Sequence, residues 1–218
     1  MAENEALLVE QRSEEWFNIR KGKITGSELH KIMGGKDGEL TQTAKTYLLE
    51  KVSELYGGHG ALASGPAIEW GVELEDTAVV VYQDRTGNTV EKCSFIPVDN
   101  NYGGSPDGKV GTEGAVEIKC PFNSVNHFKH GLINTEKAFK DVAPNYYYQC
   151  ISHMICLNAK WCDFISYDPR VSENCQMFIY RLERNEAEIE KIKAKVETAV
   201  EYMKELKTQI EAKIAKTT

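Results

Sequence analysis

Apolar residues recur every three or four positions along much of the chain, which is the spacing of one face of an α-helix. Ser13 precedes two acidic residues and fits an N-cap, so we predict a helix over about residues 13–21. Thr25 and Glu28 form a capping-box pattern, which predicts a short helix that ends at two glycines. A third helix is predicted over about residues 43–56.

A longer helix is predicted from Pro66, which suits a first helical position, to about Arg85. Its apolar stripe includes one acidic residue and consists of Ile68, Val72, Glu75, Val79 and Tyr82. A carboxylate at a core-facing position is costly unless it is paired or bound to a metal. Glu75 therefore either needs a partner or lies at the edge of the stripe and reaches solvent.

Short runs rich in apolar and β-branched residues predict strands. We expect an antiparallel meander near residues 89–97, 101–105 and 115–120. The next elements, two helices and then two strands, are expected near residues 123–130, 144–157, 161–168 and 175–182. The predicted fold class is therefore α/β, with a mixed central sheet flanked by helices.

The C-terminal region, from about residue 185 to 215, is predicted to form one long helix. Its apolar residues follow a heptad-like seam of Ile189, Ile192, Val196, Ala199, Met203, Leu206 and Ile210. Such a seam packs either on the same domain or on another subunit. No linker, low-complexity block or internal repeat divides the sequence, so we expect residues 1–218 to form a single domain.

The composition, with 41% hydrophobic and 27% charged residues in 218, is ordinary for a soluble globular protein. The formal net charge of −7 argues against a broad basic surface, so any contact with nucleic acid must be local. The acidic N-terminus has no signal-peptide pattern and no long apolar run occurs. We therefore expect a cytoplasmic protein without a membrane segment.

The cysteines and histidines show none of the spacings of zinc sites. The cysteines are expected to be reduced and mostly buried: Cys93, Cys120, Cys150, Cys156, Cys162 and Cys175. The histidines are expected to have structural roles: His30, His59, His127, His130 and His153.

The segment from Ser105 to Pro121 carries the main candidate chemistry. Asp107 follows a Gly-rich turn, and Glu117 and Lys119 lie two apart in a β-prone run. Side chains two apart on a strand point to the same face. Carboxylates are hard ligands suited to Mg²⁺, and a lysine beside them can orient or activate an attacking water. The alternative is a hairpin in which the glutamate and the lysine form a solvated pair.

Several ordered segments together resemble the phage lambda exonuclease or YqaJ-type viral recombinase family, within the PD-(D/E)xK nuclease superfamily. The superfamily motif corresponds to Pro106-Asp107 and to Glu117-Ile118-Lys119. The family segments are EWFNIRKGKITGSEL (15–29), EWGVELED (69–76), EIKCPF (117–122), YYYQCISHM (146–154) and YDPR (167–170). The resemblance covers about residues 13–183 and implies a restriction-endonuclease-like mixed central sheet.

The resemblance implies a centre with two Mg²⁺ ions, for which Mn²⁺ can substitute. Asp107 and Glu117 would be the main ligands, with Asp107 bridging and the Ile118 carbonyl contributing. Glu75 would complete the second metal site, which would give this residue the partner that it needs. Lys119 would position or activate the attacking water.

The resemblance further implies a pocket for the 5′-terminal phosphate of a duplex end, formed by Arg20, Ser27, Ser105 and Gln149. An arginine offers a bidentate fork to phosphate, while hydroxyl and amide groups fix its orientation. Ser27 lies at the start of the predicted short helix, where the helix dipole favours an anion. Gln149 would also belong to the catalytic set.

Such a site implies a Mg²⁺-dependent 5′-to-3′ exonuclease that degrades one strand of linear double-stranded DNA to mononucleotides. It would leave a 3′ single-stranded overhang for recombination by strand annealing. The family implies a ring-shaped homotrimer around DNA, a single-strand annealing protein as partner, and a phage or prophage protein in a bacterial host. The alternatives are a structure-specific endonuclease of the same superfamily, such as a junction resolvase, and a non-catalytic DNA-end-binding module.

Overall fold

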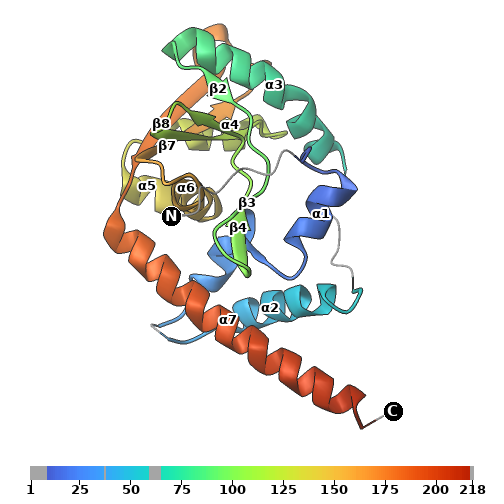
Figure 1. The fold of residues 1–218 in the computed structure, drawn as a ribbon. Coiled ribbons are helices and arrows are strands. Elements are labelled where there is room, and N and C mark those ends of the chain that lie inside the picture. The colour runs from blue at the N-terminus through green and yellow to red at the C-terminus, as the bar shows by residue number, and fades with distance from the viewer. Residues whose placement is uncertain (1–8, 37, 59–64, 217–218) are drawn as a thin grey trace.

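The computed structural model describes residues 9–36, 38–58 and 65–216 (Figure 1). The α-helices are α1 (Glu14–Arg20), α2 (Gln42–Glu54), α3 (Pro66–Thr86), α4 (Ser124–Gly131), α5 (Glu136–Val142), α6 (Pro144–Leu157) and α7 (Glu186–Ile214). The 3-10 helices are η1 (Gly26–Ile32) and η2 (Glu173–Cys175). The strands are β1 (Ile24–Thr25), β2 (Val90–Glu91), β3 (Ile96–Pro97), β4 (Tyr102–Gly104), β5 (Gly108–Val110), β6 (Gly114–Lys119), β7 (Trp161–Tyr167) and β8 (Met177–Glu183).

The central sheet has five strands in the order β2-β5-β6-β7-β8. β6 and β7 run parallel, in a register that pairs Glu117 with Phe164, and the other neighbours run antiparallel. A smaller sheet has the order β1-β4-β3. The mixed sheet is confirmed, but the predicted single meander is wrong. β3 and β4 pair with each other, whereas β6 pairs with β5, a three-residue strand too short to stand out in the sequence.

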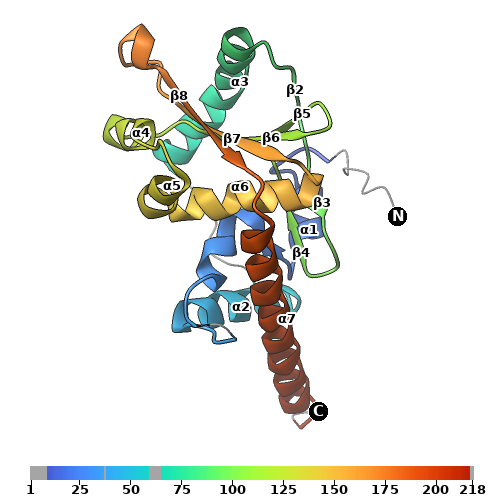
Figure 2. The same cartoon turned by 90° about the vertical axis from the view of Figure 1, so that its left-hand side faces the viewer.

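The central sheet is covered on both faces, by α3 on one side and by α6 on the other (Figure 2). Val116 and Ile118 of β6 pack in a cluster with Ala78 and Tyr82 of α3. Residues two apart on a strand share a face, so Glu117 and the end of β6 face the α6 side. The predicted alternation along this strand is therefore confirmed.

The helices around the sheet follow the predicted order, with local differences. Ser13 caps α1 as predicted, because its hydroxyl accepts a hydrogen bond from the Trp16 amide. The predicted capping box at Thr25 is wrong. The segment is a 3-10 helix, and the buried Thr25 hydroxyl accepts no hydrogen bond from the helix. α5 was not predicted, because its seven residues form only about two turns, too few for a helical period to be recognised.

The apolar stripe of α3 is buried over only part of its length. Ala78 and Tyr82 are fully buried, whereas Ile68 and Val72 are 38% and 42% exposed. The prediction of a continuous core-facing stripe is therefore wrong for the first half of α3. This half passes beside the end of β6, where side chains line a cavity instead of packing on the sheet.

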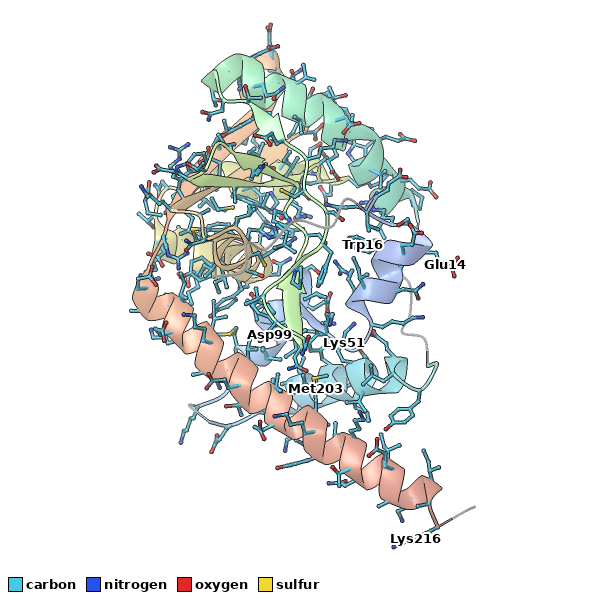
Figure 3. All side chains as sticks on the ribbon, viewed as in Figure 1. Glu14, Trp16, Lys51, Asp99, Met203 and Lys216 are labelled. Atoms are coloured by element: carbon cyan, nitrogen blue, oxygen red, sulfur yellow. The ribbon has the colours of Figure 1, made fainter. Side chains whose placement is uncertain are left out.

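The long helix α7 packs on other elements of its own chain. This is the first of the two predicted alternatives, packing on the same domain or on another subunit. Its seam contacts α2 and η1, and Met203 lies where α7 crosses α2 (Figure 3). Lys195 is only 7% exposed, and its ammonium donates to three main-chain carbonyls, those of Gly34, Lys36 and Glu39. The Lys195 side chain therefore fixes these three positions of the loop between η1 and α2 on α7.

In the described ranges, none of the helices combines the length and the apolar character needed to cross a membrane. His59, one of the histidines considered in the sequence, lies outside the described residues.

Candidate active site

Glu117 lies at the centre of the candidate site and is fully buried near the end of β6. Its Oε1 forms an ion pair with the Lys119 ammonium, and its Oε2 accepts a hydrogen bond from His153 Nε2 of α6. Burial works to raise the pKa of Glu117, but Lys119 and His153 outweigh it, so the pKa lies below its usual value. The carboxylate is therefore ionised, and His153 must donate Nε2–H to it.

Lys119 ends β6 on the same face as Glu117, and its side chain is 26% exposed. Its ammonium lies 5.1 Å from the centre of the Tyr146 ring. Burial works to lower the pKa of Lys119, but the carboxylates of Glu117 and Asp107 outweigh it and raise the pKa. Lys119 therefore places a positive charge at the mouth of the site, beside the carboxylates of Glu117 and Asp107.

Asp107 directly precedes β5 and turns its carboxylate toward the neighbouring strand. β5 pairs with β6 only as far as Val116, and the Asp107 carboxylate then accepts the Ile118 N–H at 2.6 Å. Burial raises the pKa of Asp107 well above its usual value, the charges of Glu117 and Glu75 raise it further, and Lys119 opposes them. The Asp107 side chain is thus fixed beside the main chain of Ile118.

Glu75 is half-buried on α3 and lines the cavity of about 610 Å³ that Lys119 and Ile118 also line. Burial raises its pKa, Arg12 and Lys119 oppose this shift, and the charge of Glu117 adds to it. The acid that interrupts the α3 stripe therefore faces the other charged groups of the site. Glu75 forms no hydrogen bond or ion pair with the described residues, so its role as a metal ligand stays a prediction.

The donor set suits a hard cation, because Glu75, Asp107 and Glu117 offer carboxylate oxygens whose mutual repulsion raises the pKa of Asp107. Within the described ranges, no three Asp, Glu, His or Cys side chains are arranged closely enough to hold a metal as they stand. Both oxygens of Glu117 are engaged, by Lys119 and by His153. A cation would therefore have to replace the Lys119 ammonium at Glu117 Oε1.

A second cluster surrounds Ser105, two residues before Asp107. The Ser105 hydroxyl accepts hydrogen bonds from Arg20 Nη1 at 3.2 Å and from Trp16 Nε1 at 3.0 Å. The Arg20 guanidinium stacks 3.7 Å from the centre of the Trp16 ring, and burial lowers its pKa to about 10. No carboxylate of the described residues forms an ion pair with Arg20. A guanidinium in this state is suited to an external anion.

Ser27 lines the same cavity of about 860 Å³ as Arg20 and Trp16. The helix that begins beside Ser27 is a seven-residue 3-10 helix, so the expected contribution of an α-helix dipole there is wrong. The structure thus brings Arg20, Ser27 and Ser105 together through direct contacts or a shared cavity.

Gln149 is not one of the residues that line this cavity. It is 9% exposed on α6 and lies one helical turn before His153, on the same face. Gln149 is therefore on the side of α6 that approaches Glu117, but it makes no hydrogen bond to the other predicted site residues.

His153 is the residue that the sequence analysis missed. Its assignment to a general structural role gave no hint of a contact with Glu117, which lies 36 positions earlier in the sequence. The one available signal was its position four residues after Gln149 on the same helix. Its buried Nδ1 has no hydrogen-bond partner among the described residues, so within them the Glu117 carboxylate accounts for the polar contact of this ring.

The loop that follows β6 is fixed by the YDPR segment. Asp168 is fully buried and accepts both Nε–H and Nη2–H of Arg170 at 2.8 Å. Nη2 of Arg170 also donates to the carbonyls of Pro121 and Phe122. The hydrogen bonds from Arg170 lower the pKa of Asp168. This pair therefore holds the wall of the cavity beside Lys119.

Two histidines of α4 share the hydroxyl of Ser166 on β7. His127 Nε2 lies 2.8 Å from the Cys175 carbonyl, which can only accept, so Nε2 carries a proton. The Ser166 hydroxyl lies 2.9 Å from His127 Nδ1 and 3.0 Å from His130 Nδ1. These contacts attach His130, which lines the same cavity as Lys119, to β7.

The chain is similar to known nucleases in sequence and in fold. A family model described as a YqaJ-like viral recombinase domain matches residues 15–160. An alkaline exonuclease from Laribacter hongkongensis has a TM-score of 0.81 at 31% identity, over 94% of this chain and 100% of that chain. The structure of that enzyme in complex with dAMP gives a TM-score of 0.81 at 32% identity, with the same coverage.

A more distant structure shares the fold. A phage-related exonuclease from Haemophilus somnus 129PT has a TM-score of 0.73 at 21% identity, over 86% of this chain and 96% of that chain. No curated protein sequence matches the chain.

Proposed function

The chain belongs to the YqaJ-like viral recombinase family, and from this membership we propose that it is a Mg²⁺-dependent 5′-to-3′ exonuclease of linear double-stranded DNA. A DNA exonuclease is supported by the family match and by the likeness to the alkaline exonuclease. The metal, the direction and the 3′ overhang go beyond the family match, and the arrangement of the candidate site supports them.

The observation that carries the proposal is the position of Ser105, which links the two clusters. Its hydroxyl accepts from Arg20, and Asp107 follows two residues later. A terminal phosphate bound at Arg20 would therefore lie a short distance along the strand from the carboxylates. A 5′ phosphate in that pocket would place the first phosphodiester bond at Asp107, which gives 5′-to-3′ progress and mononucleotide products.

Glu75, Asp107 and Glu117 would hold Mg²⁺, with the Ile118 carbonyl contributing and Mn²⁺ as a substitute. Bound ions would supply charge neutralisation at the phosphate and a lowered pKa for a coordinated water. Lys119 would position or activate the attacking water and offset phosphate charge. His153 would hold the Glu117 carboxylate in place throughout.

The wider assembly is also a proposal. A homotrimeric ring around DNA would explain how a chain with a net charge of −7 remains on its substrate, because enclosure replaces broad phosphate affinity. The overhang would be passed to a single-strand annealing protein in the cytoplasm of a bacterial host.

The test compares linear duplexes with 5′-phosphate or 5′-hydroxyl ends and a closed circle, in the presence of Mg²⁺. We expect the phosphorylated duplex to be degraded fastest and the circle to resist. Lys119→Ala should abolish degradation, whereas Lys109→Ala should not, since Lys109 is an exposed lysine paired with Glu91. Cutting of the circle would favour the structure-specific endonuclease, and end binding without hydrolysis would favour the non-catalytic module.

A further inference from the structure

Two cavities meet at Glu75, and Arg12 lines both of them. One is the cavity of about 610 Å³ beside Lys119. The other, of about 410 Å³, is lined by Asp107. Arg12 is exposed and lies just before α1. Its side chain therefore borders the candidate site, although neither the sequence motifs nor the proposed metal and end-phosphate ligands include it.

The backbone of Arg12 is strained. Its φ is 73°, and in the described part of the chain Asn158 is the other non-glycine residue with positive φ. Asparagine tolerates the left-handed region because its short side chain can bond locally, whereas arginine gains nothing comparable. Residues held in such conformations persist when the surrounding structure fixes them, and they concentrate at functional sites.

The neighbours of Arg12 supply this restraint. Gln11 Nε2 donates to the Cys93 carbonyl at 3.0 Å and to the Pro106 carbonyl at 3.3 Å. On the other side, Ser13 caps α1 through the Trp16 amide. The strained turn is thus attached to the residue that precedes Asp107, so the position of Arg12 is coupled to that of the carboxylate cluster.

The charge of Arg12 is not used within the described ranges. Of the other cations lining the two cavities, Lys119 pairs with Glu117 and Lys92 pairs with Asp76 at 2.5 Å. Arg12 forms no ion pair or hydrogen bond to any described side chain. Its charge is close enough to oppose the raised pKa of Glu75. An uncommitted guanidinium beside a carboxylate cluster is suited to an anion that enters between them.

We propose that Arg12 binds a backbone phosphate of the strand being degraded, at a position beside Glu75 and separate from the terminal phosphate at Arg20. This inference rests on the proposed nuclease function. The guanidinium offers two parallel N–H donors to one phosphodiester, and the strained turn directs them across the mouth of both cavities. The contact aligns the strand with the carboxylates and also offsets their repulsion of the phosphate backbone.

The first test uses Arg12→Gly, with Asn158→Gly as the matched control. Both changes place glycine where φ is positive, so neither should lower stability. Binding of a 5′-phosphorylated duplex, measured by fluorescence anisotropy with EDTA present to prevent hydrolysis, should weaken about tenfold for Arg12→Gly only. The slope of log Kd against log salt should fall by about 0.9, the amount expected for one lost phosphate contact.

The second variant, Arg12→Lys, should keep the salt slope but bind less tightly, because lysine keeps the charge and loses the bidentate fork. The proposal is overturned if Arg12→Gly keeps the salt slope of the unmodified protein. It is equally overturned if Asn158→Gly weakens binding as much, or if Arg12→Gly lowers the unfolding temperature. Hydrolysis that survives Lys119→Ala would instead refute the proposed function, and the two failures can therefore be told apart.

Discussion

The buried imidazole of His153 donates its Nε2–H to Glu117 Oε2, and the Lys119 ammonium pairs with the other oxygen of the same carboxylate. Glu117 is thus held from the α6 side by the His153 ring and from the open side by the Lys119 ammonium. A cation that enters the site would compete with Lys119, whereas it would leave the His153 contact intact. His153 is therefore a positioning residue for the proposed metal ligand.

His153→Ala should lower the affinity for the metal, and the loss of nuclease activity should follow from that weaker binding. Loss of a partner that orients a ligand typically reduces metal affinity by 10 to 100-fold. We expect weaker Mn²⁺ binding in isothermal titration calorimetry, and nuclease activity that recovers at higher Mg²⁺ concentration. His30→Gln, on η1, is the control and should bind Mn²⁺ normally. Unchanged Mn²⁺ affinity in His153→Ala would leave the ring with a packing role only.

His130 predicts how stability depends on pH. Burial lowers its pKa to about 4, and the neighbouring His127 and Lys119 add to this shift. The unfolded chain has the ordinary histidine pKa of about 6.5, so between these values it binds more protons than the folded protein. The stabilisation is complete above about pH 6.5 and is lost as the pH falls toward 4, by up to about 1.4 kcal/mol per unit.

The check is urea unfolding of the unmodified protein and of His130→Asn at several pH values from 7 to 4.5. The asparagine amide can still donate to Ser166 but does not titrate, so the fall in stability should be shallower in the variant. Equal slopes for the two proteins would show that His130 is not the group responsible.

The candidate site was predictable where the chemistry is local in sequence. The strand period predicts that Glu117 and Lys119 share one face and that Ile118 points to the other. The structure shows this alternation in β6. Ser13 was identified as a cap because capping involves residues three positions apart. The long helix α7 was equally clear, because its seam repeats over many turns.

The parts that were not predictable depend on contacts between distant segments. The split into two sheets follows from the pairing of β4 with β1 and β3, and of β6 with β5, which no local pattern specifies. The contact of His153 with Glu117 needs the packing of α6 on the sheet. The strained turn at Arg12 is held by the carbonyls of Cys93 and Pro106, more than 80 positions away.

Lys195→Met should reduce stability without altering the site. The Lys195 ammonium donates to the carbonyls of Gly34, Lys36 and Glu39 in partly buried hydrogen bonds, so its loss removes a charged donor from three carbonyls. A cost of about 2–3 kcal/mol is expected in urea unfolding. Lys193→Met is the control on the same helix, since Lys193 is exposed and forms only a surface pair with Glu190, which should contribute at most about 0.5 kcal/mol.

Arg20→Lys should separate recognition of the strand end from catalysis. Lysine keeps a positive charge but cannot stack on Trp16 and contact Ser105 in the same planar geometry, so the phosphate loses a bidentate partner. We expect the preference for a 5′-phosphate over a 5′-hydroxyl duplex to fall by about tenfold, mostly through KM, while the Mg²⁺ dependence of the remaining activity stays the same.

The matched control for Arg20→Lys is Arg85→Lys. Arg85 lies at the end of α3 and donates to the carbonyls of Met177 and Glu173, away from both clusters. The Arg85→Lys variant should retain the full preference for the phosphorylated end. If Arg20→Lys also keeps this preference, the terminal phosphate is not bound at Ser105, and the argument for 5′-to-3′ direction loses its basis. If it instead loses metal dependence, the two clusters form one site and not two.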